Sequence, residues 1–321
     1  MIKPIPVLVV AGPTAVGKTE FAINLAKKTG GEIIGCDSMQ IYKFMDIGSA
    51  KPTVEERREV PHHLIDFVDP RNEFSVARYQ NLARTAIEGI DNRGNIPIIS
   101  GGTGLFLDSI IYDMDFSQKP EGGIFNRRRD ELFKVSENHG NEALHDILVK
   151  LSPETAAKIH PNNVKKVVRA IEVLENGGNI PDYKSVQRKT FYKYDTKMFC
   201  LTRDRNELYD RINKRVDVLM NKGLLGEIEN LLKMGLSEKQ ISMKGIGYKE
   251  LFSYLNGETD LEESVRLIKR NTRRFAKRQL TWFRRYDNME WINLSRFKDI
   301  DEAVNTILEE ENHGRERYSN S

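Results

Sequence analysis

Short apolar runs alternate with amphipathic stretches along most of this chain. The apolar runs are typical of strands buried on both faces and cover residues 7–11, 32–37, 95–100 and 198–202. Apolar positions three or four residues apart predict helices at 19–28, 75–92, 205–221, 224–234 and 260–286. Strands that alternate with helices form parallel sheets, which bind ligands at the carboxyl ends of their strands. The pattern therefore predicts an α/β fold with a parallel sheet.

Residues 113–195 interrupt this alternation. They have helical periodicity at 125–139, 141–151, 153–159 and 164–176, and no pattern typical of a central strand. We interpret them as a helical insertion domain in a core that is formed by residues 1–112 and 196–290. Residues 291–321 are polar and acidic, and we expect a C-terminal tail there.

Composition excludes several classes of protein. The chain has 321 residues, of which 39 % are hydrophobic and 30 % charged; collagen and a wholly disordered chain are thereby excluded. No apolar run approaches the ~18 residues of a membrane-spanning helix, and the first ten residues lack the features of a signal peptide. Two cysteines make neither a disulfide framework nor a four-cysteine zinc site. We expect a cytoplasmic protein with no membrane partner.

Charge is unevenly distributed behind a formal net charge of +3. Residues 264–286 carry nine basic side chains and no acidic one, whereas residues 287–321 carry nine acidic and four basic ones. Basic positions 266, 270, 273, 274 and 277 fall on one helical face, opposite a largely apolar face. The apolar face consists of Val265, Ile268, Thr272, Phe275, Gln279 and Trp282. A solvated helix surface and a phosphate-binding surface both fit this block.

A glycine-rich loop follows the first predicted strand and precedes a predicted helix. Its sequence, Gly12-Pro13-Thr14-Ala15-Val16-Gly17-Lys18-Thr19, matches the phosphate-loop motif G-x-x-x-x-G-K-S/T in full. In that motif backbone N–H groups and the helix N-terminus bind phosphate, the lysine adds a charge and the last hydroxyl can bind Mg²⁺. The loop predicts a diphosphate or polyphosphate ligand, but it does not establish ATP hydrolysis.

Asp37 ends the second predicted strand. An aspartate at this position could bind Mg²⁺ through water, as in a nucleotide kinase, or act as a general base. It could also cap a helix. Composition and spacing leave these three alternatives open.

Several ordered motifs resemble those of the tRNA dimethylallyltransferase family, also called isopentenyl-diphosphate:tRNA isopentenyltransferases. They are the phosphate loop and Asp37-Ser38-Met39-Gln40-Ile41-Tyr42, Pro61-His62-His63-Leu64-Ile65-Asp66, Gly101-Gly102-Thr103-Gly104-Leu105-Phe106, His160-Pro161-Asn162, Gly245-Ile246-Gly247-Tyr248-Lys249-Glu250 and residues 272–283. The absence of a C-terminal Cys/His zinc finger favours the bacterial type. The resemblance implies a P-loop NTPase-like core with a helical insertion that clamps tRNA.

The resemblance also implies a reaction. Family members transfer a dimethylallyl group from dimethylallyl diphosphate to the exocyclic 6-amino group of the adenosine immediately 3′ of the anticodon. Asp37 would be the general base, while Thr14, Thr19 and Arg211 would assist catalysis. The diphosphate would bind residues 12–19 together with Arg211 and Arg215, and the cofactor would be Mg²⁺ at Thr19.

The tRNA contacts implied by the resemblance are spread over the chain. They are Asp37, Ser38, Met39, Gln40, Thr103, Arg129, Lys165, Lys166, Arg169, Lys244, Gly247, Tyr248 and Lys249. Asn163 and Lys166 depart from the family, which usually has an Asp and an Arg there, and Lys166 lacks the bidentate fork of arginine. We treat His62 and His63 as structural residues or anticodon-loop contacts, because adjacent strand residues point to opposite faces. A monomer is expected.

Other functions compete with this hypothesis. A P-loop small-molecule kinase or an isopentenyltransferase acting on free AMP would share the phosphate loop, and so would a non-enzymatic RNA-binding protein. The basic insertion and the basic helix at 264–286 argue against a free nucleotide as substrate, since binding of such a small molecule requires neither of them. Lys18, Thr19 and Asp37 argue against a protein without activity.

Overall fold

The computed structural model describes residues 3–112, 114, 123–178 and 193–319. Contacts divide the chain into two compact units. The larger comprises Met1–Tyr112 with Phe191–Ser321, and the smaller comprises Asp113–Thr190. Parts of the expected insertion, 115–122 and 179–192, lie outside the described residues.

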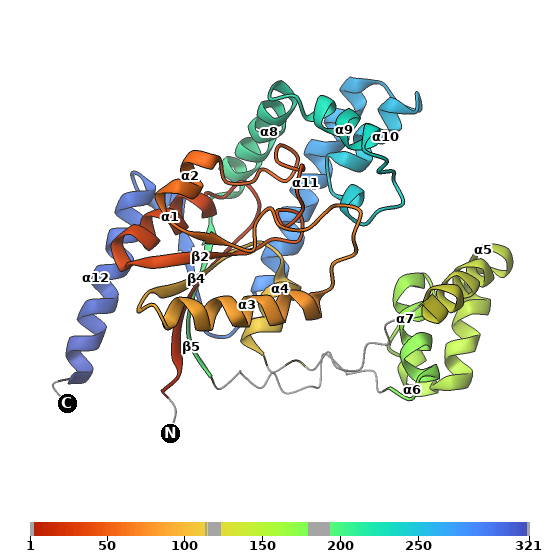
Figure 1. The fold of residues 1–321 in the computed structure, drawn as a ribbon, viewed down its shortest axis with the longest axis horizontal. Coiled ribbons are helices and arrows are strands. Elements are labelled where there is room, and N and C mark those ends of the chain that lie inside the picture. The colour runs from red at the N-terminus through yellow and green to blue at the C-terminus, as the bar shows by residue number, and fades with distance from the viewer. Residues whose placement is uncertain (1–2, 113, 115–122, 179–192, 320–321) are drawn as a thin grey trace. The chain divides into compact units, whose positions relative to one another are not determined.

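A six-stranded parallel sheet forms the centre of the larger unit (Figure 1). Its order is β3-β2-β4-β1-β5-β6. The strands are β1 Ile5–Ala11, β2 Gly31–Cys36, β3 His62–His63, β4 Ile96–Gly101, β5 Tyr194–Thr202 and β6 Met289–Asn293. The central strand β1 pairs on both sides, with Val9 opposite Ile99 of β4 and Met198 of β5. The predicted α/β fold with a parallel sheet is confirmed.

Successive residues of β1 serve two different hydrophobic cores. Val7 and Val9 face one cluster, which includes buried residues of α3 Val76–Asp91 and α4 Gly104–Ile111. Val10 faces the other cluster, formed with α1 Lys18–Thr29, α8 Arg205–Asn221 and α12 Ile300–Ser319. This alternation explains why β1 is apolar along its length, since side chains of a strand point alternately to the two faces.

The remaining helices of this unit lie between or beside these layers. They are α2 Val54–Glu59, α9 Leu224–Lys233, α10 Tyr248–Leu255 and α11 Leu261–Phe283, with short 3₁₀ turns at Ser242–Lys244 and Leu294–Arg296. The periodicity analysis missed α2, α4 and α10, which have only six or eight residues each. So short a helix carries little periodic signal and depends on its neighbours for stability.

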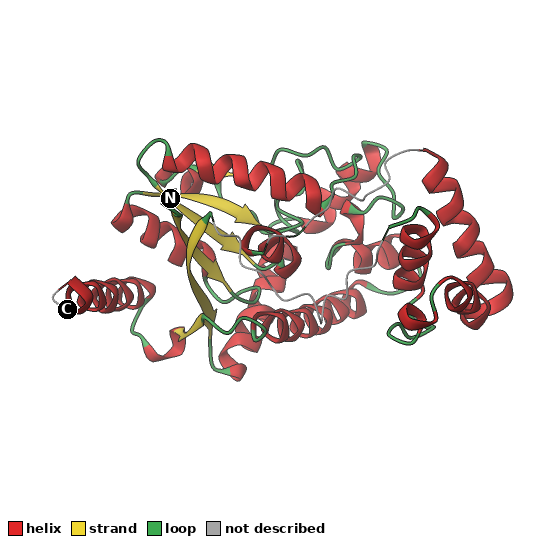
Figure 2. Cartoon of the chain, turned by 90° about the horizontal axis from the view of Figure 1, so that it is seen from below, coloured by secondary structure: helices red, strands yellow, loops and turns green. Residues whose placement is uncertain are grey.

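The described part of the smaller unit is helical (Figure 2). It contains α5 Gly123–Leu151, α6 Pro153–Ala156 and α7 Val164–Glu175. The backbone of α5 kinks at Gly140, where φ is 85° and ψ is 165°, at the boundary between two predicted helices. Leucines of α5 pack against α7 in a core of their own, which includes Leu132, Leu144, Val167 and Ile171.

The end of the chain differs from the tail that we expected over residues 291–321. Strand β6 extends the sheet beside β5, and α12 packs against α1 (Figure 1). Ala303, Val304 and Ile307 of α12 are buried in the same cluster as α1. The acidic composition masked this amphipathic pattern, because Asp301, Glu302 and Glu309 lie on the exposed side of the helix.

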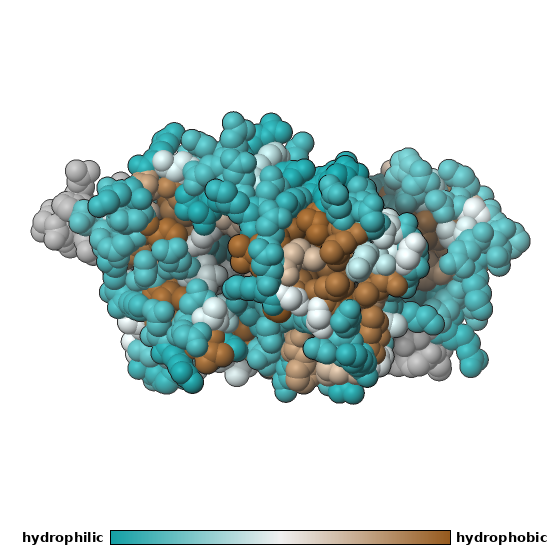
Figure 3. Space-filling model, turned by 90° about the horizontal axis from the view of Figure 1, so that it is seen from above, coloured by the Kyte–Doolittle hydropathy of each residue, from teal (hydrophilic) through white to brown (hydrophobic). Residues whose placement is uncertain are grey.

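No helix among the described residues is long and apolar enough to cross a membrane. On the face drawn in Figure 3 hydrophilic side chains predominate and apolar ones gather in a few patches.

Replacing Val304 by Ala tests whether α12 is part of the fold. Because Val304 is fully buried, removal of two methyl groups should lower the free energy of unfolding by about 1.5–3 kcal/mol. Urea denaturation of the full chain measures this change. Asp301→Asn is the control, because it affects only exposed contacts, an ion pair with Lys28 and a hydrogen bond from Asn305, and should leave stability nearly unchanged. An unaltered midpoint in Val304→Ala would mean that α12 is detached.

Candidate active site

The phosphate loop leaves β1 after Ala11 and enters α1 at Lys18. At Gly12 φ is 149°, and a Cβ there would lie 2.7 Å from the carbonyl oxygen of Leu201, so only glycine fits. Gly17 is the N-cap of α1 with φ at 115°. Ala15 has φ at 64° without being glycine, and strain of this kind is common at ligand-binding loops.

Three side chains from distant segments hold the backbone of this loop. Gln279 of α11 accepts the N–H of Thr14 (3.0 Å) and donates to the carbonyl of Gly102 (3.0 Å). Arg203 Nε donates to the carbonyl of Val16 (2.9 Å) and Arg211 Nε to that of Ala15 (3.0 Å). Arg211 was predicted to contact the diphosphate, and its bond to the loop, the bond of Arg203 and the role of Gln279 were not predicted from the sequence. For Gln279, the signal in the sequence was an amide side chain on a largely apolar helix face.

Lys18 is partly buried and its Nζ donates to the carbonyl of Pro13 at 2.8 Å. Burial lowers the pKa of Lys18 to about 8, and nearby Arg215 also lowers it, whereas Asp37 raises it. Burial likewise lowers the pKa of Arg215, against the opposing effect of Asp37. The carboxylate of Asp37 therefore interacts with both cations, which places Lys18, Asp37 and Arg215 in one site.

Asp37 follows the last residue of β2. Its Oδ1 accepts the backbone N–H of Met39 at 2.8 Å and, more weakly, that of Gln40 at 3.4 Å. Among the described residues none donates a hydrogen bond to Oδ2. The next helix begins only at Val54, so the helix-cap alternative is wrong. One carboxylate oxygen thus fixes the local turn, and the other is available for chemistry.

Thr103 lies beside this aspartate. Its Oγ1 accepts the N–H of Ser38 at 3.0 Å and is 3.3 Å from the Ser38 hydroxyl. The turn that carries Thr103 approaches β2 closely, because a Cβ on Gly101 would lie 2.0 Å from the carbonyl oxygen of Cys36. The glycines of this turn are needed to bring Thr103 and Asp37 together.

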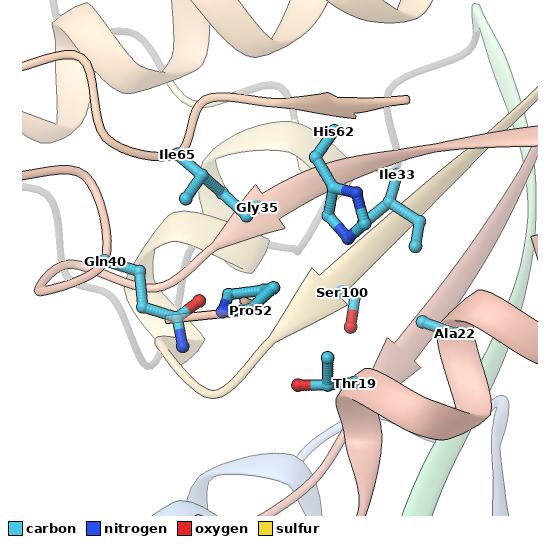
Figure 4. Close-up of a pocket in the computed structure, with 9 residues that line it drawn as sticks. All are labelled: Thr19, Ala22, Ile33, Gly35, Gln40, Pro52, His62, Ile65 and Ser100. Carbon is cyan, nitrogen blue, oxygen red and sulfur yellow. The ribbon is translucent and has the colours of Figure 1, made fainter. Parts of the chain in front are cut away.

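A small cavity of about 20 Å³ lies next to the phosphate loop. It is lined by Thr19, Ala22, Ile33, Gly35, Gln40, Pro52, His62, Ile65 and Ser100 (Figure 4). Figure 4 shows the hydroxyls of Thr19, at the start of α1, and Ser100, near the end of β4, at the same wall. Hydroxyl oxygens are weak ligands for Mg²⁺, which usually keeps waters and binds substrate phosphates as well.

The two histidines have structural partners. His63 Nε2 is 2.6 Å from a carboxylate oxygen of the buried Glu32, which also accepts hydrogen bonds from Arg93 and Asn95. The hydrogen bonds of Arg93 above all hold the pKa of Glu32 at about 2. His62 Nδ1 is 2.9 Å from the carbonyl of Val60, and burial lowers its pKa.

The turn over residues 242–249 adjoins the segment after Asp37. A Cβ on Gly245 would lie 2.6 Å from the Met39 Cε. Lys244 and Lys249 are exposed, as binding to RNA requires. Tyr248 was expected to contact tRNA as well, but it is 1 % exposed and its hydroxyl donates to Glu227. Gly247, expected in the same role, is also buried. These two residues support the turn from inside.

The expected RNA contacts of the smaller unit differ from one another in their surroundings. Arg129 forms a bidentate ion pair with the buried Glu172, at 2.7 and 3.0 Å, and Arg169 lies 3.6 Å from the same carboxylate. Arg129 therefore stabilises the unit, which sequence spacing did not indicate. Lys165 and Lys166, in the first turn of α7, are exposed and pair with no described acidic residue.

The basic block of α11 is divided in a similar way. Lys269 pairs with Asp217 of α8 at 2.6 Å, and Arg273 donates to Asn213 of α8 at 2.5 Å. These two basic side chains join helices. Exposed ones remain at Arg274, Lys277, Arg278 and Arg284.

Taken together, a phosphate loop, two partly buried cations and a strand-end carboxylate define a P-loop protein with a site for an anionic substrate. Comparison with known families is more specific. The chain matches the family described as IPP transferase over residues 40–286, and the isopentenyl transferase family over residues 5–67. The chain belongs to the IPP transferase family, which confirms the resemblance found from the motifs.

Individual relatives agree with this assignment. The chain is 50 % identical over 305 residues to the tRNA dimethylallyltransferase of Alkaliphilus oremlandii, covering 94 % of this chain and 96 % of that one. It is 46 % identical over 307 residues to that of Clostridioides difficile, covering 96 % and 97 %.

Two solved structures are similar to the whole chain or most of it. The tRNA isopentenylpyrophosphate transferase of Bacillus halodurans matches with a TM-score of 0.71 and 42 % identity, over 98 % of this chain and 100 % of that one. A eukaryotic dimethylallyltransferase, described as acting on tRNA, matches with a TM-score of 0.73 and 32 % identity, over 87 % and 70 %.

The lowered pKa of Lys18 predicts a pH dependence of anion binding. A phosphate ligand binds the protonated lysine, so affinity for inorganic diphosphate should fall as pH rises through about 8. Calorimetry between pH 6.5 and 9.5 measures the change. Lys18→Arg is the matched control, since a guanidinium keeps its charge over this range. The comparison removes the titration of diphosphate itself. Parallel pH profiles of affinity for the two proteins would show that Lys18 does not titrate in this range and would contradict the prediction.

Proposed function

We propose that this chain transfers a dimethylallyl group from dimethylallyl diphosphate to the exocyclic 6-amino group of the adenosine immediately 3′ of the anticodon in tRNA. The observation that carries the proposal is that Asp37, after β2, and the phosphate loop, after β1, share one sheet edge with only β4 between the two strands. The charge of Asp37 also acts on Lys18 and Arg215. This juxtaposition puts an anion-binding loop next to a proton acceptor, as transfer from a diphosphate to an amine requires.

The phosphate loop would hold the diphosphate as a leaving group. When the allylic C–O bond breaks, negative charge accumulates on the diphosphate, and Lys18, Arg215 and Arg211 are positioned around the loop to stabilise it. The backbone N–H groups at the start of α1 add to this field. The hydroxyls of Thr14 and Thr19 would contact phosphate oxygens. Lys18 would exchange its bond to Pro13 for one to the ligand.

Asp37 would accept a proton from the amino group as the new C–N bond forms. An exocyclic amine is a poor nucleophile, because its lone pair is delocalised into the ring, so removal of the proton assists its attack. The unpartnered Oδ2 is suited to this role, while the bond from Met39 to Oδ1 holds the carboxylate in place. The target base must leave its stack to reach the site.

Mg²⁺ fits the donor set beside the loop. Thr19 and Ser100 supply hydroxyl oxygens at the cavity wall, and diphosphate oxygens and waters would supply the remaining ligands. Among the described residues no group of three or more His, Cys, Asp or Glu side chains is arranged to hold a metal, so the ion would bind together with the diphosphate. When bound, it neutralises charge on the leaving group.

Binding of tRNA would use residues from both units. Ser38, Met39, Gln40 and Thr103 would surround the adenosine. Lys244 and Lys249 are exposed beside this segment, and Lys165, Lys166 and Arg169 of α7 would contact phosphates. Since tRNA is a cytoplasmic molecule, we propose that the chain acts in the cytoplasm, and we retain the expectation of a monomer.

One assay separates this function from its competitors. The full chain is incubated with Mg²⁺ and labelled dimethylallyl diphosphate, together with either bulk tRNA or AMP. Label in tRNA supports the proposal. Label in AMP alone identifies a nucleotide isopentenyltransferase, and release of γ-phosphate from ATP without prenyl transfer identifies a kinase.

The role of Asp37 is tested by Asp37→Asn and Asp37→Ala. Both should lower kcat about 100-fold or more, because neither side chain accepts the proton. The KM for dimethylallyl diphosphate should stay nearly constant. Asn retains an oxygen that accepts the Met39 N–H and so preserves the turn. A loss of kcat that both variants share is therefore due to the missing proton acceptor. An unaltered kcat in either variant would contradict the role of Asp37 as general base.

The role of the α7 lysines is tested through salt dependence. In Lys165→Ala/Lys166→Ala, each lost phosphate contact should reduce the slope of log affinity for tRNA against log salt by about 0.7–0.9. Lys150→Ala/Lys134→Ala removes equal charge from α5 and serves as the control. Filter binding at several KCl concentrations supplies the slopes. Equal slopes in both double variants would exclude the two lysines from the RNA contact.

A further inference from the structure

Glu227 of α9 accepts four hydrogen bonds, although no motif singled it out. Its Oε2 accepts the backbone N–H groups of Asp46 and Ile47, both at 2.7 Å. Its Oε1 accepts the N–H of Gly48 at 3.0 Å and the hydroxyl of Tyr248 at 2.8 Å. Three consecutive backbone amides around one carboxylate form an anion-binding nest, which here is filled from within the protein.

The nest belongs to a loop over residues 44–50 that has little regular structure of its own. Phe44 and Ala50 have φ at 64° and 46° although neither is glycine, a conformation that persists only when surrounding contacts impose it. Tyr248 packs so closely that a Cβ on Gly48 would lie 2.4 Å from its Cζ. Glu227 and Tyr248 together thus impose the shape of the loop.

The far end of the same loop holds the side chain of Gln40. Gln40 Nε2 donates to the carbonyls of Ser49 (3.3 Å) and Ala50 (3.1 Å). Because both contacts are acceptors, they fix which end of the amide is nitrogen. Oε1 receives no hydrogen bond from a described residue. Gln40 also lines the cavity beside the phosphate loop (Figure 4), three residues after Asp37.

We propose that Glu227 is a positioning residue for the transfer reaction: it fixes the 44–50 loop, whose carbonyls orient the Gln40 amide so that Oε1 faces the amino group of the target adenosine. The inference rests on the proposed function. The chemistry is complementary, because a glutamine oxygen accepts a hydrogen bond from the 6-amino group of adenine. Glu227 itself touches neither substrate.

Glu227→Gln tests the proposal. A glutamine has one oxygen, so its NH₂ group must face either the Asp46 and Ile47 amides or the Gly48 amide and Tyr248 hydroxyl. Loss of hydrogen bonds to a charged group should reduce kcat/KM for tRNA about tenfold or more. The KM for dimethylallyl diphosphate should not change. Glu229→Gln, on the exposed side of the same helix, is the matched control and should behave as wild type.

A double-variant cycle separates positioning from a general loss of stability. If Glu227 acts through Gln40, then Glu227→Gln/Gln40→Ala should be no more impaired in kcat/KM for tRNA than Gln40→Ala alone. Hydrogen exchange should show loss of protection at residues 46–48 in Glu227→Gln. If that variant does not fold, the cycle is run with Glu227→Asp, which keeps both oxygens but withdraws them by ~1.5 Å.

Additive effects in the cycle would overturn the inference, and so would an equal rise of both KM values or unchanged exchange at residues 46–48. Failure of the proposed function gives a different result, because the wild-type protein would then transfer no labelled dimethylallyl group to tRNA. The cycle is interpreted only if the wild-type protein does transfer it.

Discussion

Lys18 and Arg215 are partly buried cations near the carboxylate of Asp37, and the site depends on the balance of charge among these three. Burial lowers the pKa of each cation, and Asp37 opposes that effect. Desolvation of a charged group is costly without an opposite charge, and Asp37 supplies that charge to both cations. A diphosphate would take over that role and leave the carboxylate available as a base.

The parallel sheet supplies the geometry for this balance. Strands β1, β2 and β4 are neighbours, and their carboxyl ends bring the phosphate loop, Asp37 and the Thr103 turn to one edge. Glycines at positions 12 and 101 permit the close approach, because a side chain at either would collide with a backbone carbonyl oxygen. The motifs that identify the family are therefore the same segments that form the site at the carboxyl ends of these strands.

Periodicity and motifs predicted much of this arrangement. Apolar runs located four of the six strands, and the glycine pattern located the loop, since both signals are local in sequence. Contacts between distant residues left no such signal. The pairing of Arg129 with Glu172, the core position of Tyr248 and the four bonds to Glu227 depend on tertiary packing. Helix α12 was missed for another reason, because its acidic face obscured its apolar one.

Gln279 bonds with its oxygen to the phosphate loop and with its nitrogen to the turn that precedes Thr103. Neither turn can shift alone without breaking one of those bonds. A single amide thus holds the phosphate loop and the Thr103 turn at a fixed distance from each other, so the segment proposed to bind the diphosphate and the one proposed to bind the adenosine move as one body.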